Sequence, residues 1–255
     1  MSSASTGTDD QFGAPEDHAG GPNDRRAAAK WRDARVVEVA HPAVDAVVLR
    51  LAVPERVQHL PGQHYVVRLR APDGYTAQRS YSVASAPGDE LVELFVERIE
   101  DGEVSGYLAD VVEPGDELEV RGPIGRWFVW DTKSRVLCLV GGTGVVPAVA
   151  MARTARRLGR TDLLRIAAMG RTPDDLAYAP ELGRYGATFA FTRAEVGDRL
   201  AGPFTAEELA PLLEGVDLGY VCGSARFASY AEDLLIASGL DPVAIRVERF
   251  GPTGD

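Results

Sequence analysis

The sequence predicts two folded units in series: a small antiparallel β-barrel, then a parallel α/β sheet with helices on both faces. Short alternating apolar and charged runs fill the first part of the 255-residue chain, and continuous apolar runs alternate with helical stretches in the second. Alternation is typical of strands with one face in water, and continuous apolar strands are typical of covered parallel sheets. We place the barrel at residues 31–133 and the α/β unit at 134–255, after a disordered tail over residues 1–30.

Six short strands are expected in the first unit, which is typical of a small closed barrel. In the run Val92–Arg98, alternation should turn Glu93 and Glu97 toward water, and Phe95 is the one exception to the pattern. Turns such as Pro114-Gly115 separate the strands. The other predicted strands are Arg35–Ala40, Ala46–Val53, His64–Arg70, Arg79–Ala84 and Glu117–Arg121.

The second unit alternates strands with helices from Val136 onward, as a doubly wound parallel sheet requires. Its predicted strands are Val136–Val140, Leu163–Met169, Ala187–Thr192, Gly219–Cys222 and Ala244–Glu248. Its predicted helices are Pro147–Leu158, Asp175–Leu182, Ala206–Leu213 and Arg226–Ser238.

Composition excludes several classes of function. With 27 basic and 38 acidic residues the net charge is -11, which argues against general nucleic-acid binding. The two cysteines cannot supply an all-cysteine zinc site or the four thiolates of an iron–sulfur cluster. We expect no metal and no membrane span. We expect a cytoplasmic location, because residues 1–24 lack the apolar core of a signal peptide. We also expect a monomer.

A first motif, Arg79-Ser80-Tyr81-Ser82, lies in a predicted strand. Alternate side chains of a strand share a face, so Arg79 and Tyr81 should point the same way. A guanidinium binds phosphate with paired hydrogen bonds, and a tyrosine ring offers a flat surface to an aromatic cofactor. The motif alone also fits an ordinary barrel strand with an exposed arginine.

A second motif, Gly102-Glu103-Val104-Ser105, opens a short helix predicted to run to about Val112. The N-terminus of a helix presents free amides and a partial positive charge, which suits a phosphate. The same residues also fit a plain turn with Ser105 as the helix N-cap.

A third motif, Gly141-Gly142-Thr143-Gly144-Val145-Val146-Pro147, follows a buried strand and opens a helix. That context is the one a dinucleotide-binding loop requires, because glycines let the backbone approach a pyrophosphate. Pro147 replaces the third glycine of the common fingerprint and suits the first turn of a helix. A tight strand-to-helix turn without a ligand is the alternative.

The fourth motif is Cys222-Gly223, at the end of a predicted parallel strand. The carboxyl ends of parallel strands are where α/β sheets bind ligands, so Cys222 should lie at the site. Plain burial is the alternative for Cys222, and burial as a small apolar residue is the prediction for Cys138.

In this order, the four motifs resemble those of the ferredoxin–NADP reductase family of flavoproteins, over residues 35–250. The resemblance implies a six-stranded antiparallel Greek-key barrel that binds FAD, followed by a five-stranded parallel, doubly wound NAD(P)-binding domain. It also implies that hydride passes from NADPH or NADH to bound FAD. Single electrons would then pass to a separate acceptor protein, such as a ferredoxin, flavodoxin, cytochrome P450, oxygenase component or molybdenum enzyme.

The resemblance also implies roles for single residues. Tyr81, Ser82 and Cys222 are the expected catalytic residues. Arg79 should bind the flavin phosphate, and the second motif should hold the pyrophosphate, which favours FAD over FMN. The full set expected to bind FAD or nucleotide is Arg79, Tyr81, Ser82, Val96, Gly102, Val104, Ser105, Gly142, Thr143, Gly144, Pro147, Arg171, Thr192, Arg193, Cys222, Gly223 and Phe250.

Three points stay open from the sequence. Thr192-Arg193 resembles the pair that binds the 2′-phosphate in NADP-specific relatives, which favours NADPH, but a solvated loop arginine is the alternative. Many relatives end on an aromatic residue that covers the flavin, whereas this chain continues five residues past Phe250. The sequence also allows two alternative functions: a flavin reductase that releases reduced flavin, and a non-catalytic nucleotide-binding subunit.

Overall fold

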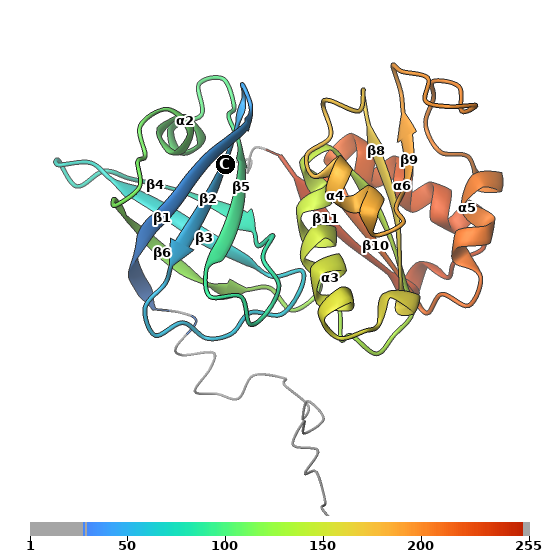
Figure 1. Ribbon diagram of the computed structural model, residues 1–255, viewed down its shortest axis with the longest axis horizontal. Coiled ribbons are helices and arrows are strands. Elements are labelled where there is room, and N and C mark those ends of the chain that lie inside the picture. Colours follow the sequence, from blue (N-terminus) through green and yellow to red (C-terminus); the bar gives the residue numbers. More distant parts are fainter. Residues whose placement is uncertain (1–27, 29, 252–255) are drawn as a thin grey trace, which may run out of the picture.

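The computed structural model describes residue 28 and residues 30–251, which form two units side by side, each built on its own sheet (Figure 1). The predicted tail over residues 1–30 therefore lies almost entirely outside the described residues. The last four residues, which follow Gly251, lie outside them as well.

The first sheet is antiparallel, with the strand order β4-β3-β6-β1-β2-β5. Its two end strands meet at a bridge between Val83 and Leu94, beside a hydrogen bond from Ala84 N to Glu93 O (2.8 Å), so the sheet closes into a barrel there. A short helix, α2 (Glu103–Asp110), follows β5. The strands are β1 (Trp31–Ala43), β2 (Ala46–Ala52), β3 (His64–Arg70), β4 (Thr76–Ser82), β5 (Val92–Glu97) and β6 (Glu117–Ile124).

The second sheet is parallel, with the strand order β11-β10-β7-β8-β9. It confirms the predicted α/β unit. The strands are β7 (Val136–Gly141), β8 (Leu164–Gly170), β9 (Thr188–Phe191), β10 (Leu218–Ser224) and β11 (Ile245–Phe250). The helices are α3 (Val145–Arg157), α4 (Ala179–Arg184), α5 (Ala206–Leu213) and α6 (Ala225–Ala237). Within residues 30–251, no helix has the length and apolar composition needed to cross a bilayer.

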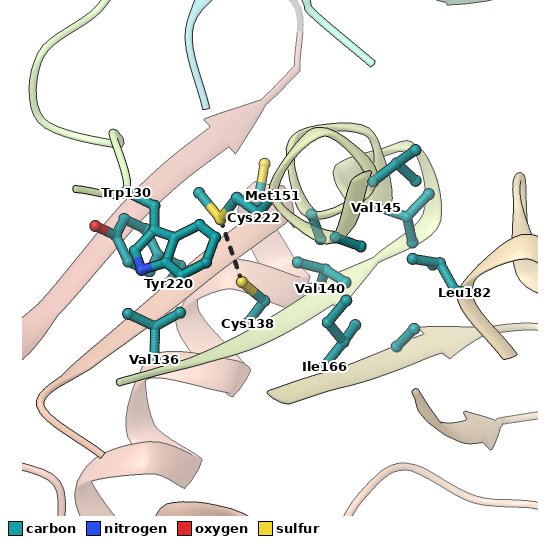
Figure 2. Packing of buried hydrophobic residues seen from close by; sticks show 14 of the residues in the cluster. Trp130, Val136, Cys138, Val140, Val145, Met151, Ile166, Leu182, Tyr220 and Cys222 are labelled. Atoms are coloured by element: carbon teal, nitrogen blue, oxygen red, sulfur yellow. Dashed lines mark hydrogen bonds between the residues drawn. The ribbon is translucent and has the colours of Figure 1, made fainter. Parts of the chain in front are cut away.

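Helices cover the parallel sheet on both faces, as continuous apolar strands require. In β7, Cys138 and Val140 pack in one cluster with residues of α3 and α4, and Figure 2 shows this cluster. Leu137 and Leu139 pack on the opposite face with residues of α5 and α6. The face with α3 and α4 is the one turned toward the barrel (Figure 1).

One predicted helix is shorter and later than expected. The prediction was Asp175–Leu182, whereas α4 runs from Ala179 to Arg184. Tyr178 has a left-handed backbone (φ 57°), which a right-handed helix cannot continue through. Pro180 then suits the first turn, since it lacks the amide hydrogen that a helix interior needs.

The strongest departure concerns Glu93, which was expected to face water. It is only 4% exposed. The outward face of β5 is covered by the second unit, where Phe95 and Ala84 of the barrel pack with Val146 of α3 and Tyr178. The predicted alternation in β5 is correct as a period, and Glu97 is exposed as expected, but the second face is buried at Glu93 and Phe95.

The segment before β7 packs closely against the barrel, and Gly62 marks the contact. Its φ is +100°, and a Cβ there would overlap the carbonyl oxygen of Phe128. Gly74 has a similar φ of +92° but open space around it. A side chain at either position would suffer a similar backbone strain from the positive φ, but only a side chain at Gly62 would also overlap a neighbouring atom.

We expect Gly62→Ala to lower the free energy of unfolding by about 1 to 3 kcal/mol more than Gly74→Ala, because only Gly62 gains an overlap. Thermal unfolding of the two variants measures the difference, at about 2 to 4 °C per kcal/mol for a chain of this size. Equal unfolding midpoints would contradict the close contact at Phe128.

Candidate functional site

The first motif lies on β4, an end strand of its sheet, just before the bridge at Val83 that closes the barrel. Strand alternation puts Arg79 and Tyr81 on one face and Ser82 on the other. Arg79 is exposed, whereas Tyr81 is half-buried against the barrel core, and that burial raises the pKa of its phenol. A planar ligand on the face shared by Arg79 and Tyr81 could reach both of these side chains.

Ser82 offers the clearest sign of a ligand on the barrel side. It is 6% exposed, and its Oγ has no hydrogen-bond partner in the part of the chain that the structure describes. An unpaired buried hydroxyl is costly, so such an atom marks a position where a polar ligand atom fits.

The N-terminus of α2 lies near the same edge. Gly102 is the helix N-cap, and the amides of the first turn have no partner within the helix. The Ser105 hydroxyl closes the preceding turn, accepting from Ile99 N (3.2 Å) and donating to Gly102 O (3.4 Å). Val104 packs in the barrel core. Only backbone amides of this motif are therefore free for a phosphate.

Arg79 and this helix end share one neighbourhood. The Tyr75 hydroxyl donates to Glu103 Oε2 over 2.9 Å, and the Arg79 guanidinium is close enough to oppose the rise in the pKa of Tyr75 that this bond causes. Val96 does not join them: its side chain has no exposed surface and packs inside the barrel. That placement leaves only its backbone for a ligand.

The glycine loop forms a single 3₁₀ turn, Gly142–Gly144, before α3. A Cβ on Gly144 would overlap the carbonyl group of Cys222, so two backbone segments meet where only glycine fits. Gly142 has φ +56° and open space beside it. Thr143 between them is half-buried, and Pro147 is buried in the first turn of α3. The third and fourth motifs are thus one structural unit.

Cys222 is fully buried rather than presented at the surface. It has no exposed area, and burial raises the pKa of its thiol well above the ordinary value. Figure 2 shows it in the cluster with Cys138 and Met151, whose sulfur atoms lie 3.5 Å apart. Gly223, next along β10, leaves room for the Phe227 ring. The predicted burial of Cys138 is confirmed.

Sequence reasoning missed Glu248, which lies beside Cys222 in the register of β10 and β11. Burial raises its pKa to about 7, and its Oε2 is buried without a hydrogen-bond partner among the described residues. Its Oε1 lies 3.9 Å from His64 Nδ1. A glutamate in a predicted terminal strand carries no local signal of this burial.

His64 connects the two halves of the site. It pairs with Ser82 in the register of β3 and β4, and it reaches Glu248 on the parallel sheet. The end of the barrel edge and the carboxyl ends of β10 and β11 therefore meet at one place. Two unpaired buried polar atoms, Ser82 Oγ and Glu248 Oε2, lie on its two sides.

The loops after β8 and β9 also lie side by side. Arg193 N donates to Arg171 O over 2.8 Å, and Thr192 N donates to Gly170 O over 3.0 Å. Both arginines are exposed, and Arg171 Nη2 lies 3.3 Å from Asp175 Oδ1. Two guanidinium groups at neighbouring strand ends suit a phosphate.

Phe250 is the last residue of β11 and pairs with Ser224. It is half-buried against the cluster that holds Cys222. The residues after Gly251 lie outside the part of the chain that the structure describes.

Comparison with known proteins supports an oxidoreductase. Residues 33–129 match the family described as "Oxidoreductase FAD-binding domain". Over 208 residues the chain is 31% identical to the 2-halobenzoate 1,2-dioxygenase electron transfer component of Burkholderia cepacia, covering 78% of this chain and 60% of that protein. It is 28% identical to the ferredoxin reductase component of the 3-ketosteroid-9-alpha-monooxygenase of Mycolicibacterium smegmatis, covering 85% and 64%. The chain thus spans under two thirds of the length of these relatives.

Solved structures show the same fold. The FAD/NAD-binding domain of nitric oxide dioxygenase from Vibrio cholerae superposes with a TM-score of 0.78 at 23% identity, covering 87% of this chain and 99% of that one. A ferredoxin NADP⁺ reductase from Neisseria gonorrhoeae, with bound FAD and NADP, gives 0.73 at 20% identity, covering 87% and 99%. Both therefore support the expected barrel and parallel sheet.

We expect Glu248 to make stability depend on pH. Its pKa is raised from 4.5 to about 7 in the folded protein, so its stabilising contribution is full below pH 4.5 and is lost as pH rises through 7. The loss amounts to about 3 kcal/mol at most. Glu248→Gln should flatten the unfolding midpoint between pH 5 and 8, whereas Glu214→Gln, at an exposed position, should follow the wild-type curve. A Glu248→Gln curve parallel to wild type would contradict the burial.

Proposed function

Since this chain is a ferredoxin–NADP reductase-like FAD- and NAD(P)-binding oxidoreductase domain, we propose that it reduces a separate acceptor protein with electrons from NADPH. Bound FAD would accept a hydride from the nicotinamide and release the two electrons one at a time. One observation carries the proposal. His64 pairs with Ser82 on the barrel strand proposed to bind flavin, and it also contacts Glu248 on the parallel sheet proposed to bind the nucleotide.

Residues 31–133 are the proposed flavin half. Arg79 binds a flavin phosphate, the first amides of α2 hold the pyrophosphate, and the Tyr81 ring lies against the flavin. Ser82 Oγ supplies a hydrogen bond to the ring. The unpaired state of that hydroxyl supports this role, because a bound ligand would satisfy it.

Residues 134–255 are the proposed nucleotide half. The Gly142–Gly144 turn opens α3 and brings backbone amides to a pyrophosphate. Thr143 flanks the nicotinamide, and Cys222, whose neutral thiol is buried, contributes to this part of the site through its backbone. The exposed Arg171 and Arg193 bind a 2′-phosphate, which favours NADPH over NADH.

The acceptor that we propose is an oxygenase component. Two relatives of this chain are named as electron transfer or ferredoxin reductase components of oxygenases, which supports this class. A ferredoxin, a flavodoxin or a cytochrome P450 are the other acceptors compatible with single-electron release. The protein itself would work as a monomer.

Anaerobic reduction tests the function directly. In protein loaded with FAD, NADPH should reduce the flavin, seen as a loss of its visible absorbance, and NADH should do so more slowly. The reduced protein should then reduce ferricyanide and a [2Fe–2S] protein. A protein that binds no FAD would contradict the proposal. Loss of reduced flavin through a dialysis membrane would instead identify a flavin reductase.

Arg79→Ala should weaken FAD binding about 10- to 100-fold, because a charge-assisted contact to phosphate contributes about 1.5 to 3 kcal/mol. Arg70→Ala, on the neighbouring β3, is the control and should retain wild-type affinity. Fluorescence titration of the apoprotein with FAD measures both. Equal affinities would remove Arg79 from the flavin site.

Arg193→Ala should raise the KM for NADPH about 10- to 100-fold and change the KM for NADH less than about threefold, since only NADPH carries the 2′-phosphate. Arg156→Ala, at the far end of α3, is the matched control. Steady-state ferricyanide reduction gives both constants. An equal rise in the KM values for NADH and NADPH would show that Arg193 does not bind the 2′-phosphate.

A further inference from the structure

The carboxylate of Glu93 is bound from both units of the protein. Its Oε2 accepts from Arg50 Nε over 3.0 Å within the barrel. Its Oε1 accepts from Arg153 Nη1 and from the Tyr178 hydroxyl, each over 2.9 Å, and both of these come from the second unit. With three donors this buried carboxylate is paired from both units, so loss of one donor would leave a buried charge partly uncompensated.

Arg153 bonds to both units of the protein. It makes a bidentate pair with Glu181, over 2.7 and 2.9 Å, inside its own unit. Toward the barrel it binds Glu93 and donates to Ala84 O over 3.0 Å. These carboxylates raise the pKa of the guanidinium despite its burial, so it stays charged. One planar group thereby fixes three partners in a set geometry.

The partners of Arg153 lie next to the two halves of the proposed site. Ala84 follows Ser82 by two residues on the barrel side. Arg153 lies on α3, whose N-terminus carries the Gly142–Gly144 turn. In Figure 1, α3 and α4 are the helices that face β5. Between the site and Arg153, Val146 packs with Ala84 and Phe95, so α3 contacts the barrel along one face.

We propose that Arg153 is a positioning residue for hydride transfer: it fixes the distance between the Ser82 edge and the nucleotide loop. The inference rests on the proposed function. The glycine turn leads directly into the rigid helix that carries Arg153, so fixing Arg153 also fixes the turn. On the barrel side, its bonds to Glu93 and Ala84 O hold it next to the strand that carries Ser82. Hydride transfer needs close approach of donor and acceptor, and a misplacement of about 1 Å costs up to about 100-fold in rate.

Arg157, another α3 arginine that bonds to the barrel, is more exposed and cannot replace Arg153. Arg157 reaches Asp89 and Pro87 O from the next turn of α3, but its side chain is 46% exposed. Exposed ion pairs contribute little to a fixed geometry. The Arg153 side chain, in contrast, is 19% exposed.

The kinetic test compares Arg153→Gln with Arg68→Gln. Arg68 is the control, because its side chain has the same exposed fraction (19%) and makes a bidentate pair with Glu119 wholly within the barrel. In anaerobic stopped-flow reduction of the FAD-loaded protein, Arg153→Gln should lower the limiting rate constant about 10- to 100-fold. The Kd for NADPH should change less than about threefold, and Arg68→Gln should match wild type in both.

A milder variant covers the case in which Arg153→Gln does not fold. Tyr178→Phe removes one hydroxyl donor from Glu93 and leaves the ring that packs on Phe95. It should lower the same rate constant about two- to fivefold. A wild-type rate in the folded variants would overturn the proposal.

A distance measurement tests positioning without any activity. Both native cysteines are buried, so spin labels can be attached selectively to Glu113→Cys on the barrel and Glu207→Cys on α5. Pulsed EPR should give one narrow distance distribution in the parent and in Arg68→Gln, and a broadened one in Arg153→Gln. An equally narrow distribution in Arg153→Gln would overturn the proposal, even if its rate were low.

The two measurements also separate this proposal from the proposed function. A wild-type protein that NADPH does not reduce would contradict the function, and the EPR comparison would still decide whether Arg153 fixes the two units. Broadened distances with a wild-type rate would show that the arrangement does not limit hydride transfer, which also overturns the proposal.

Discussion

A carboxylate that is buried between two folded units needs hydrogen-bond donors. The donors to Glu93 come from both units, so its pairing determines how the two units lie against each other. Burying an ionised carboxylate alone would cost several kcal/mol, so β5 cannot lie against α3 and α4 unless donors meet it there. Arg50, Arg153 and Tyr178 meet it from both units. Apolar packing around Phe95 covers one side of the network, whereas the Arg50 side chain on the other side is 43% exposed.

The candidate site depends on this arrangement, because neither unit contains it alone. The barrel contributes the β4 edge with Ser82, and the parallel sheet contributes the Gly142–Gly144 turn and Glu248. Gly144 permits the turn to touch the backbone at Cys222, so the loop and the end of β10 are packed directly together. His64 then lies between the two contributions.

Local pattern predicted much of the fold, because strand alternation and apolar runs reflect burial within one unit. It also placed the glycine turn and Cys222 together, since the carboxyl ends of neighbouring parallel strands share an edge. It failed where burial came from the other unit. Glu93 is predicted to face water because strand alternation gives no information on burial by another unit. Phe95, an apolar residue on the same face, is the one sign in the sequence that this face is covered. Arg153 and Glu248 likewise have the sequence context of exposed residues.

A crystal structure of the protein with FAD and NADP⁺ tests the central claim, that one arrangement of the two units forms the site. We predict the flavin along the β4 edge with Ser82 Oγ bonded to its ring, the nucleotide pyrophosphate on the Gly142–Gly144 turn, and the Glu93–Arg153 pair intact. A flavin bound away from β4, or a complex in which Arg153 has left Glu93, would contradict the account.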